Sequence, residues 1–447
     1  MEKIYNILLL TNRDSDNLGD QVIEECDIAI IKTIMHNLGF GDDEYKIHSR
    51  AAGMITKKYM ATRDPELLKS AEKSVETADL IVFGGAPIFN FKYQMFYERT
   101  ALTLELAEKY GRPVLFSAIG VEGYDEEDEK CQRLKKTLNF DCVKQITTRD
   151  DMESLIKYRE NENTVIGKVA DPAVFTSEVF ADFKQENGTG EKKKIGLFIL
   201  RANGFIDNGV DFDRHSAALM WKELTQKLKA AGYDYELITS GHFGDEAFME
   251  DLFRKYDISL ADCVFNMNNP ESLIAKISSY DAIVSTRLHP SIISFSLGVP
   301  AVGLVWNSKV KHFYENIGYP ERVVEMDGVT TDKIVEKISE AVETGVEKDS
   351  EYLMTVYDSL FDGFKRVFCP NSDAAPYTYE ELGEKMYRFQ GTTEKEQLIK
   401  LERKFRRAYE KYNQVSQKHR DAQKKLSDMK SIKSLTKMVV KRIIGRK

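Results

Sequence analysis

The chain has 447 residues, a length that predicts two or three domains. Hydrophobic residues make up 42% of the chain and charged residues 30%, and the mean hydropathy of -0.41 indicates a soluble protein with filled cores. The apolar run that follows Lys3 is too short for a signal peptide, and no stretch approaches the roughly 18 apolar residues of a membrane-spanning helix. We therefore expect a cytoplasmic protein.

The cysteines argue against two common structural sites. They are odd in number and scattered, and none forms a CxxC pair or a Cys/His cluster, so the sequence predicts neither a disulfide framework nor a structural zinc. We expect no metal site. The five are Cys26, Cys131, Cys142, Cys263 and Cys369.

The first half of the chain alternates apolar strands with helices. Strands are expected at residues 4–10, 78–83 and 113–119, with a helix at 21–38. Short apolar strands joined by helices are typical of βαβ units with a parallel sheet. The pattern predicts an N-terminal α/β domain over residues 1–181.

A second α/β series begins after a polar linker near residues 185–194. We expect it to form a domain over 195–390, which the aromatic residues of 353–390 should close. Its expected elements are strands at 195–200, 235–239, 280–285 and 299–306 and a helix at 217–231. The fold class is therefore α/β, with two Rossmann-like domains that face a cleft, the usual place of catalysis.

The run from residue 285 to residue 313 contains the clearest candidate site. A buried strand ends there and the chain turns at once into a helix, so Arg287 and His289 lie where ligands bind in open α/β sheets. Pro290 suits the first helical position. Arginine binds anions in a bidentate manner and histidine exchanges protons near neutral pH, so the run predicts an anion-binding catalytic site. The alternative is that Arg287 pairs with a structural carboxylate and that His289 is a hinge residue with its hydrogen bonds satisfied.

Further polar residues and glycines follow predicted strands and are candidates for substrate binding. Structural alternatives stand beside them: Asn17 could cap the next helix, Gly84-Gly85 could form a plain tight turn, and Arg149 could lie beside a helix cap. The basic members would give the second half a cationic rim on an acidic body. The candidates are Asn17, Gly19, Asp20, Gly84, Gly85, Arg149, Arg201, His242, Lys309 and Lys311.

Four elements together resemble the polysaccharide pyruvyl transferase family. They are NLGD at 17–20, TRD at 148–150, ADPA at 170–173 and, most specifically, STRLHP…GVPAVGLVWNSKVKHF within 285–313. The resemblance covers about residues 4–320. It implies a two-domain fold of the GT-B type. It also implies that the enolpyruvyl carbons of phosphoenolpyruvate are moved onto two sugar hydroxyls, which gives a cyclic ketal and free phosphate.

The resemblance implies contacts to phosphoenolpyruvate for Arg287, Leu288 and His289, and no cofactor besides this donor. Arg287 would hold the carboxylate or the leaving phosphate. His289 as imidazolium would protonate the enol carbon and as imidazole would accept a hydroxyl proton. The chain has Gly-Gly-Ala at 84–86 where the family usually has a longer glycine run. A nucleotide-sugar glycosyltransferase and a non-catalytic scaffold of polysaccharide synthesis remain alternatives.

The last segment, 395–447, differs from the rest in charge. It holds 18 Lys+Arg and 5 Asp+Glu, a net charge of +13, so residues 1–394 carry -21 of the total of -8. Apolar residues at heptad spacing from 398 to 429 predict a coiled coil and hence a homo-oligomer. Residues 431–447 form a basic amphipathic stretch that predicts contact with an anionic membrane, or else a solvated helix end. No nucleic acid partner is expected.

Overall fold

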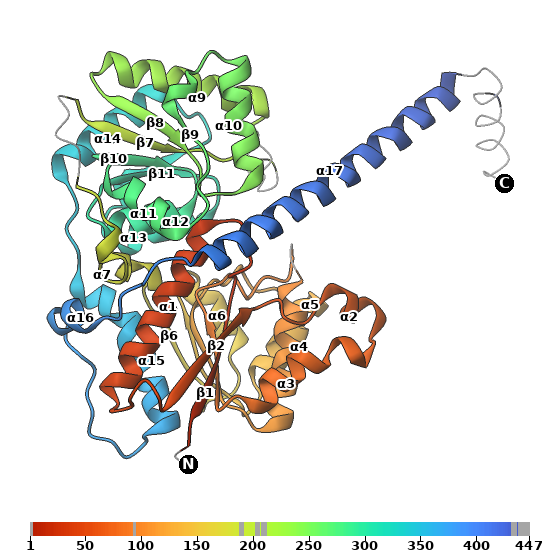
Figure 1. Cartoon of the computed structure of the whole chain (residues 1–447), viewed down its shortest axis with the longest axis vertical. Helices are drawn as coiled ribbons and strands as arrows, with labels where there is room; N and C mark the ends of the chain where they lie inside the picture. The colour runs from red at the N-terminus through yellow and green to blue at the C-terminus, as the bar shows by residue number, and fades with distance from the viewer. Residues whose placement is uncertain are drawn as a thin grey trace. The chain divides into compact units, whose positions relative to one another are not determined.

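The structure is a computed structural model that describes residues 3–92, 95–186, 192–201, 206, 212–430 and 436. It divides into two compact units, Met1–Thr392 and Thr393–Lys447. The larger unit contains two six-stranded sheets with helices on both faces of each (Figure 1), so the α/β class and the pair of Rossmann-like domains are confirmed.

All neighbouring strands of the first sheet pair in parallel, in the order β2-β1-β3-β4-β5-β6. Every residue of β3 and β4 is buried, because helices cover both faces. Helices α1 and α15 pack on one face and α3, α4 and α5 on the other (Figure 1). The strands are β1 (Tyr5–Thr11), β2 (Tyr45–Ala51), β3 (Leu80–Gly84), β4 (Val114–Ile119), β5 (Val143–Thr148) and β6 (Val165–Lys168).

The second sheet is likewise parallel, in the order β12-β11-β10-β7-β8-β9. Helices α9, α10 and α14 share a core with one face, and α11, α12 and α13 with the other. The strands are β7 (Lys194–Phe198), β8 (Asp234–Ile238), β9 (Cys263–Val264), β10 (Ala282–Ser285), β11 (Ala301–Val305) and β12 (Val323–Glu325).

The α-helices of the first region are α1 (Leu18–Asn37), α2 (Lys57–Thr62), α3 (Lys69–Thr77), α4 (Phe96–Tyr110), α5 (Glu129–Leu138), α6 (Met152–Tyr158) and α7 (Thr176–Val179). Those that follow are α9 (Arg214–Ala230), α10 (Phe243–Lys255), α11 (Pro270–Ser278), α12 (Leu288–Ser296), α13 (Ser308–Asn316), α14 (Thr331–Thr344), α15 (Ser350–Phe368), α16 (Tyr379–Lys385) and α17 (Glu394–Lys430).

Helix α15 corrects the expectation that residues 353–390 close the second domain. It packs instead on the first sheet beside α1, with Tyr357, Phe361 and Phe364 fully buried in the core that they share with α1. Gln145 of β5 donates from Nε2 to the carbonyl oxygen of Ser359 at 3.0 Å. The aromatic residues of α15 lie beside α1 and cover apolar residues on the same face of the sheet.

The smaller unit contains helix α17. Five large residues of its heptad seam are exposed in the single chain, from 54% for Leu426 to 69% for Tyr412, whereas Leu401 and Ala408 are partly exposed. The helix is confirmed, whereas the coiled coil stays a prediction. The basic stretch 431–447 lies outside the described residues apart from Thr436. None of the helices described here has the length and apolar character needed to cross a membrane.

Candidate active site

The candidate residues gather where the strand order of each sheet reverses. The order reverses between β1 and β3 in the first sheet and between β7 and β10 in the second, and ligands bind in open α/β sheets at the carboxyl ends of such strands. Asn17 follows β1, Gly84 ends β3, and Arg201 and Arg287 follow β7 and β10. The backbone N–H of Leu18 donates to the carbonyl oxygen of Ser240 at 2.8 Å, so the first turn of α1 joins the two domains.

His289 lies in the first turn of α12 and contacts this turn of α1. Its Nδ1 is 3.0 Å from Nδ2 of Asn17 and 3.8 Å from Oδ1 of Asp20. An amide nitrogen only donates, so Nδ1 accepts and the ring hydrogen lies on Nε2. A Cβ at Gly19 would lie 2.2 Å from Cβ of His289. The glycine therefore allows the close approach of the imidazole, where the sequence suggested the approach of a ligand.

Asn17 serves two purposes at once. Its side chain accepts from the backbone N–H of Gly19 at 3.3 Å, so it caps α1, as the structural alternative predicted. The same amide contacts His289.

Helix α12 begins at Leu288, so Pro290 stands third in the helix rather than first. A proline fits there because the N–H groups of the first turn have no partner inside the helix.

Burial and nearby charges act together on the protonation of His289. Burial lowers the pKa of His289 well below its usual range, and the neighbouring cations Arg149, Arg287 and Lys309 lower it further. These surroundings favour the neutral imidazole over the imidazolium that the resemblance implies. Burial also raises the pKa of Asp20 to about 6, although hydrogen bonds and cations oppose this. A carboxyl that is half protonated at about pH 6 thus stands beside the imidazole.

Arg287 pairs with a buried carboxylate, as the structural alternative predicted, although the sequence did not identify which one. Its Nε and Nη2 both lie 2.6 Å from Oδ2 of Asp245, which is fully buried in the first turn of α10. Oδ1 of the same carboxylate accepts from the backbone N–H of Arg201 at 3.2 Å and lies 3.5 Å from its Nη1. Nη1 of Arg201 is also 2.9 Å from Nδ1 of His242, the cap of α10. Two guanidinium groups share one carboxylate, so the cluster keeps excess positive charge.

Arg149 is buried at the end of β5, and its structural alternative is confirmed in part. It donates to the carbonyl oxygen of Gly85 at 2.7 Å and pairs with Asp171. It does not reach the open cleft through these contacts. It still lowers the pKa of His289, and it lines a small buried hollow with Leu288 and Lys309. Arg149 therefore contributes positive charge to the site from the first domain.

The two lysines of α13, Lys309 and Lys311, have different partners. Lys309 pairs with Glu122, which follows β4 and also accepts from the Asn90 amide, so this ion pair bridges the two domains. Lys311 is half exposed and lies 3.9 Å from Glu325, away from these groups. Sequence reasoning found Lys309 and missed Glu122, since an isolated acid after a strand carries no signal of its partner.

Gly84 and Gly85 lie at the carboxyl end of β3, where α1 packs against the strand. A Cβ at Gly84 would lie 2.2 Å from Oδ2 of Asp27, and one at Gly85 would lie 2.1 Å from Ile23. Both contacts come from α1. The glycines are therefore required for packing of α1 against β3, which favours the structural alternative over direct contact with a substrate.

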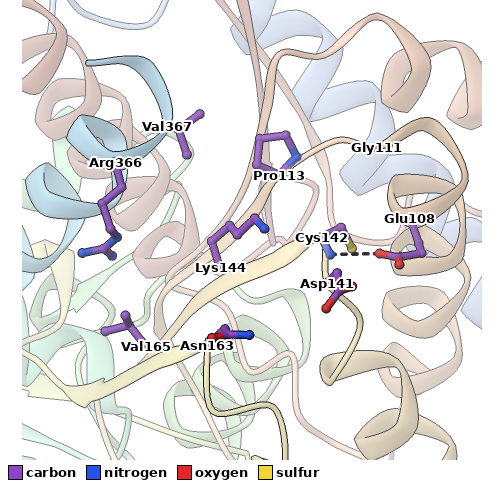
Figure 2. A pocket seen from close by; sticks show the side chains of 10 residues that line it. All are labelled: Glu108, Gly111, Pro113, Asp141, Cys142, Lys144, Asn163, Val165, Arg366 and Val367. Carbon is purple, nitrogen blue, oxygen red and sulfur yellow. Dashed lines mark hydrogen bonds between the residues drawn. The ribbon is translucent and has the colours of Figure 1, made fainter. Parts of the chain in front are cut away.

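A cavity of about 540 Å³ lies at the opposite edge of the first sheet (Figure 2). Pro113, Cys142 and Val165 line it at the amino ends of β4, β5 and β6, and Arg366 of α15 borders it. Glu108 accepts from the backbone N–H of Cys142 at 2.9 Å, as the dashed line shows. None of the predicted site residues lines this cavity.

Comparisons with known proteins identify the fold and the family. The fold is similar to that of a protein described as a UDP-N-acetylglucosamine 2-epimerase from Listeria monocytogenes, with 8% identity, a TM-score of 0.55 and coverage of 84% of this chain and 99% of that one. The UDP-GlcNAc 2-epimerase of Methanocaldococcus jannaschii has 13% identity, a TM-score of 0.49 and coverages of 80% and 98%. No curated protein matches the sequence. The model of the polysaccharide pyruvyl transferase family matches residues 17–308, more than half of the chain, and the chain belongs to that family.

Proposed function

We propose that this protein transfers the pyruvyl group of phosphoenolpyruvate to a sugar of a cell-surface polysaccharide or its precursor. Membership of the family supports the class of reaction. The observation that carries the proposal is the neutral imidazole of His289 beside Asp20, with the cations Arg149, Arg287 and Lys309 around it. Phosphoenolpyruvate has a carboxylate and a phosphate, and such a cationic cluster suits both.

The proposed reaction balances without any further reactant. The CH2 carbon of the donor takes a proton with its π electrons and becomes a methyl group, which leaves an oxocarbenium at C2. One sugar hydroxyl attacks C2 and loses its proton. Phosphate then leaves with the electrons of its C–O bond, and a second hydroxyl attacks C2. Of the two hydroxyl protons, one balances the methyl group and the other leaves on phosphate.

Proton movement in this site is expected to depend on donor binding. Burial and then the surrounding cations lower the pKa of His289. The negative charges of phosphoenolpyruvate would offset these cations and raise the pKa of His289, so that the ring takes up a proton as the donor binds. His289 would then protonate the donor, and the carboxyl group of Asp20, 3.8 Å from Nδ1, would stabilise the imidazolium beforehand. Calorimetric titration in buffers of different ionisation enthalpy measures this uptake.

Two measurements test the function itself. Phosphoenolpyruvate should bind to the wild type in calorimetry, bind far more weakly to Arg287→Ala, and bind normally to the control Lys311→Ala. Phosphate release in the presence of a productive acceptor should follow the same order. Saturable binding of a nucleotide sugar, with none of phosphoenolpyruvate, would overturn the proposal in favour of glycosyl transfer.

We also propose that α17 pairs with α17 of a second copy of the chain. Its exposed heptad residues need a partner, and Lys404, Lys411, Lys418 and Lys425 recur at one position beside them. In an antiparallel pair these lysine rows would face each other, so the repulsion favours parallel pairing. Both basic segments 431–447 would then follow from the same end, which suits contact with an anionic membrane from the cytoplasm.

A further inference from the structure

Arg99 of α4 is a partly buried cation without a charge partner in the described part of the chain. Its Nε is buried and has no hydrogen-bond partner. Burial lowers the pKa of Arg99, and no carboxylate acts to raise it. The preceding Glu98 pairs with Arg63 and Arg133 instead. A guanidinium that loses water without gaining a carboxylate is costly to keep, which points to a ligand that supplies the missing charge.

The backbone beneath Arg99 is shaped to receive it. A Cβ at Gly53 would lie 2.3 Å from Nη1 of Arg99 and 3.2 Å from its Cζ, so the guanidinium rests directly on the glycine. Gly53 follows the end of β2, and Arg99 is the fourth residue of α4, the helix that follows β3. The guanidinium therefore lies at the carboxyl edge of the first sheet, on the side that carries the ligand crevice.

A series of hydrogen bonds and close contacts connects this position to His289. The backbone N–H of Ala52 donates to the carbonyl oxygen of Thr11 at 2.7 Å, which fixes the Gly53 loop to the end of β1. The next residue, Asn12, donates from Nδ2 to Oδ2 of Asp20 at 3.0 Å. Asp20 is the carboxyl beside His289. Arg99 thus lies along the same edge of the sheet, against the loop that follows β2, the strand next to β1.

We propose that Arg99 binds an anionic group of the acceptor, either a phosphate next to the sugar or the carboxylate of a uronic acid. The inference rests on the proposed function, in which the donor occupies the cations around His289. The donor's negative groups are accounted for there, so a separate cation on the first domain is available to the acceptor. Both kinds of anion match the two-pronged geometry of a guanidinium.

Binding of small anions tests the proposal without knowledge of the acceptor. The probes are inorganic pyrophosphate and D-glucuronate, titrated by calorimetry at constant ionic strength into Arg287→Gln protein, in which the donor site is disabled. Adding Arg99→Gln should weaken binding of at least one probe by about tenfold or more, and Arg99→Lys should recover part of it. Adding Arg63→Gln, which removes an exposed arginine of the same region, should change nothing. The probe that responds distinguishes phosphate from carboxylate.

The proposal would be overturned if Arg287→Gln protein bound both probes equally well with and without the added Arg99→Gln change. Absence of probe binding to both proteins would overturn it as well. Should Arg287→Gln melt early, Lys309→Met provides the second background. In the wild-type background, Arg99→Gln should leave phosphoenolpyruvate affinity and the melting temperature unchanged or raise the latter. A fall in melting temperature would indicate a structural role instead. If phosphoenolpyruvate fails to bind the wild type, the proposed function is refuted. The anion-binding role of Arg99 is decided separately, by the titrations with pyrophosphate and glucuronate.

Discussion

Replacing Gly19 by alanine tests whether the turn of α1 positions His289. The new Cβ would lie 2.2 Å from Cβ of His289 and 2.4 Å from its Nδ1. Carbon atoms in ordinary contact are about 3.5–4.0 Å apart, so the ring or the helix must move by more than about 1 Å. The contact with Asn17 at 3.0 Å would be lost in either case.

The size of the effect follows from this displacement. A misplacement of about 1 Å in a catalytic group can cost about 100-fold in rate, so we expect a loss of at least that size in phosphate release. Overpacking should cost about 1–3 kcal/mol in the free energy of unfolding. The control is Gly383→Ala, because Gly383 lies in helix α16 with no atom within 4 Å of the new Cβ. It should leave activity unchanged and stabilise slightly.

The assay can be direct. The ¹⁵N chemical shifts of the His289 ring report both its contact with Asn17 and its protonation, and they can be assigned among the 7 histidines by comparison with His289→Gln. Gly19→Ala should shift Nδ1 and abolish proton uptake on donor binding. Unchanged ring shifts together with unchanged uptake would refute the view that Gly19 exists to admit the imidazole.

Three further outcomes are expected. Asp245→Asn leaves two arginines without their shared carboxylate, so urea unfolding should show a loss of about 3 kcal/mol and calorimetry weaker donor binding; an unchanged midpoint would contradict this. The pKa of Asp20 is about 6 in the folded protein against 3.8 as its ordinary value, so the folded state binds this proton more tightly and wild-type stability should fall as pH rises from about 4 to about 6, by up to about 3 kcal/mol. Asp20→Asn should lack that part of the pH dependence in urea unfolding, and an identical slope would argue against it. Val415→Glu should lower the molar mass measured by light scattering, whereas Gln417→Glu, outside the heptad core, should not; equal masses would exclude pairing through this face.

The general location of the site could be predicted because it depends on short-range patterns. Apolar runs that end in a polar residue or glycine specify strands, and the carboxyl ends of parallel strands meet at one edge. Arg287, His289 and Asn17 were therefore found from local sequence. The separation of Lys309 from Lys311 was missed because no helix was expected over Ser308–Asn316, where residues two apart point to different sides.

The partners of these residues could not be predicted, since they depend on contacts far apart in the chain. Asp245 is 42 positions from Arg287, and Glu122 is 187 positions from Lys309. An acid in the first turn of a helix looks the same whether it caps the helix or holds an arginine from another strand. The neutral state of His289 is likewise a sum of burial and three cations that only the folded chain assembles.

The return of α15 to the first sheet gives the second domain two tethers. The chain leaves the first domain between Phe183 and Lys194 and re-enters it between Thr344 and Ser350. A body held by one tether can rotate about any axis, whereas two tethers restrict rotation to the line that joins them. Any opening of the site is therefore expected to be a hinge motion about that line, and it would withdraw His289 from Asn17 along a single path.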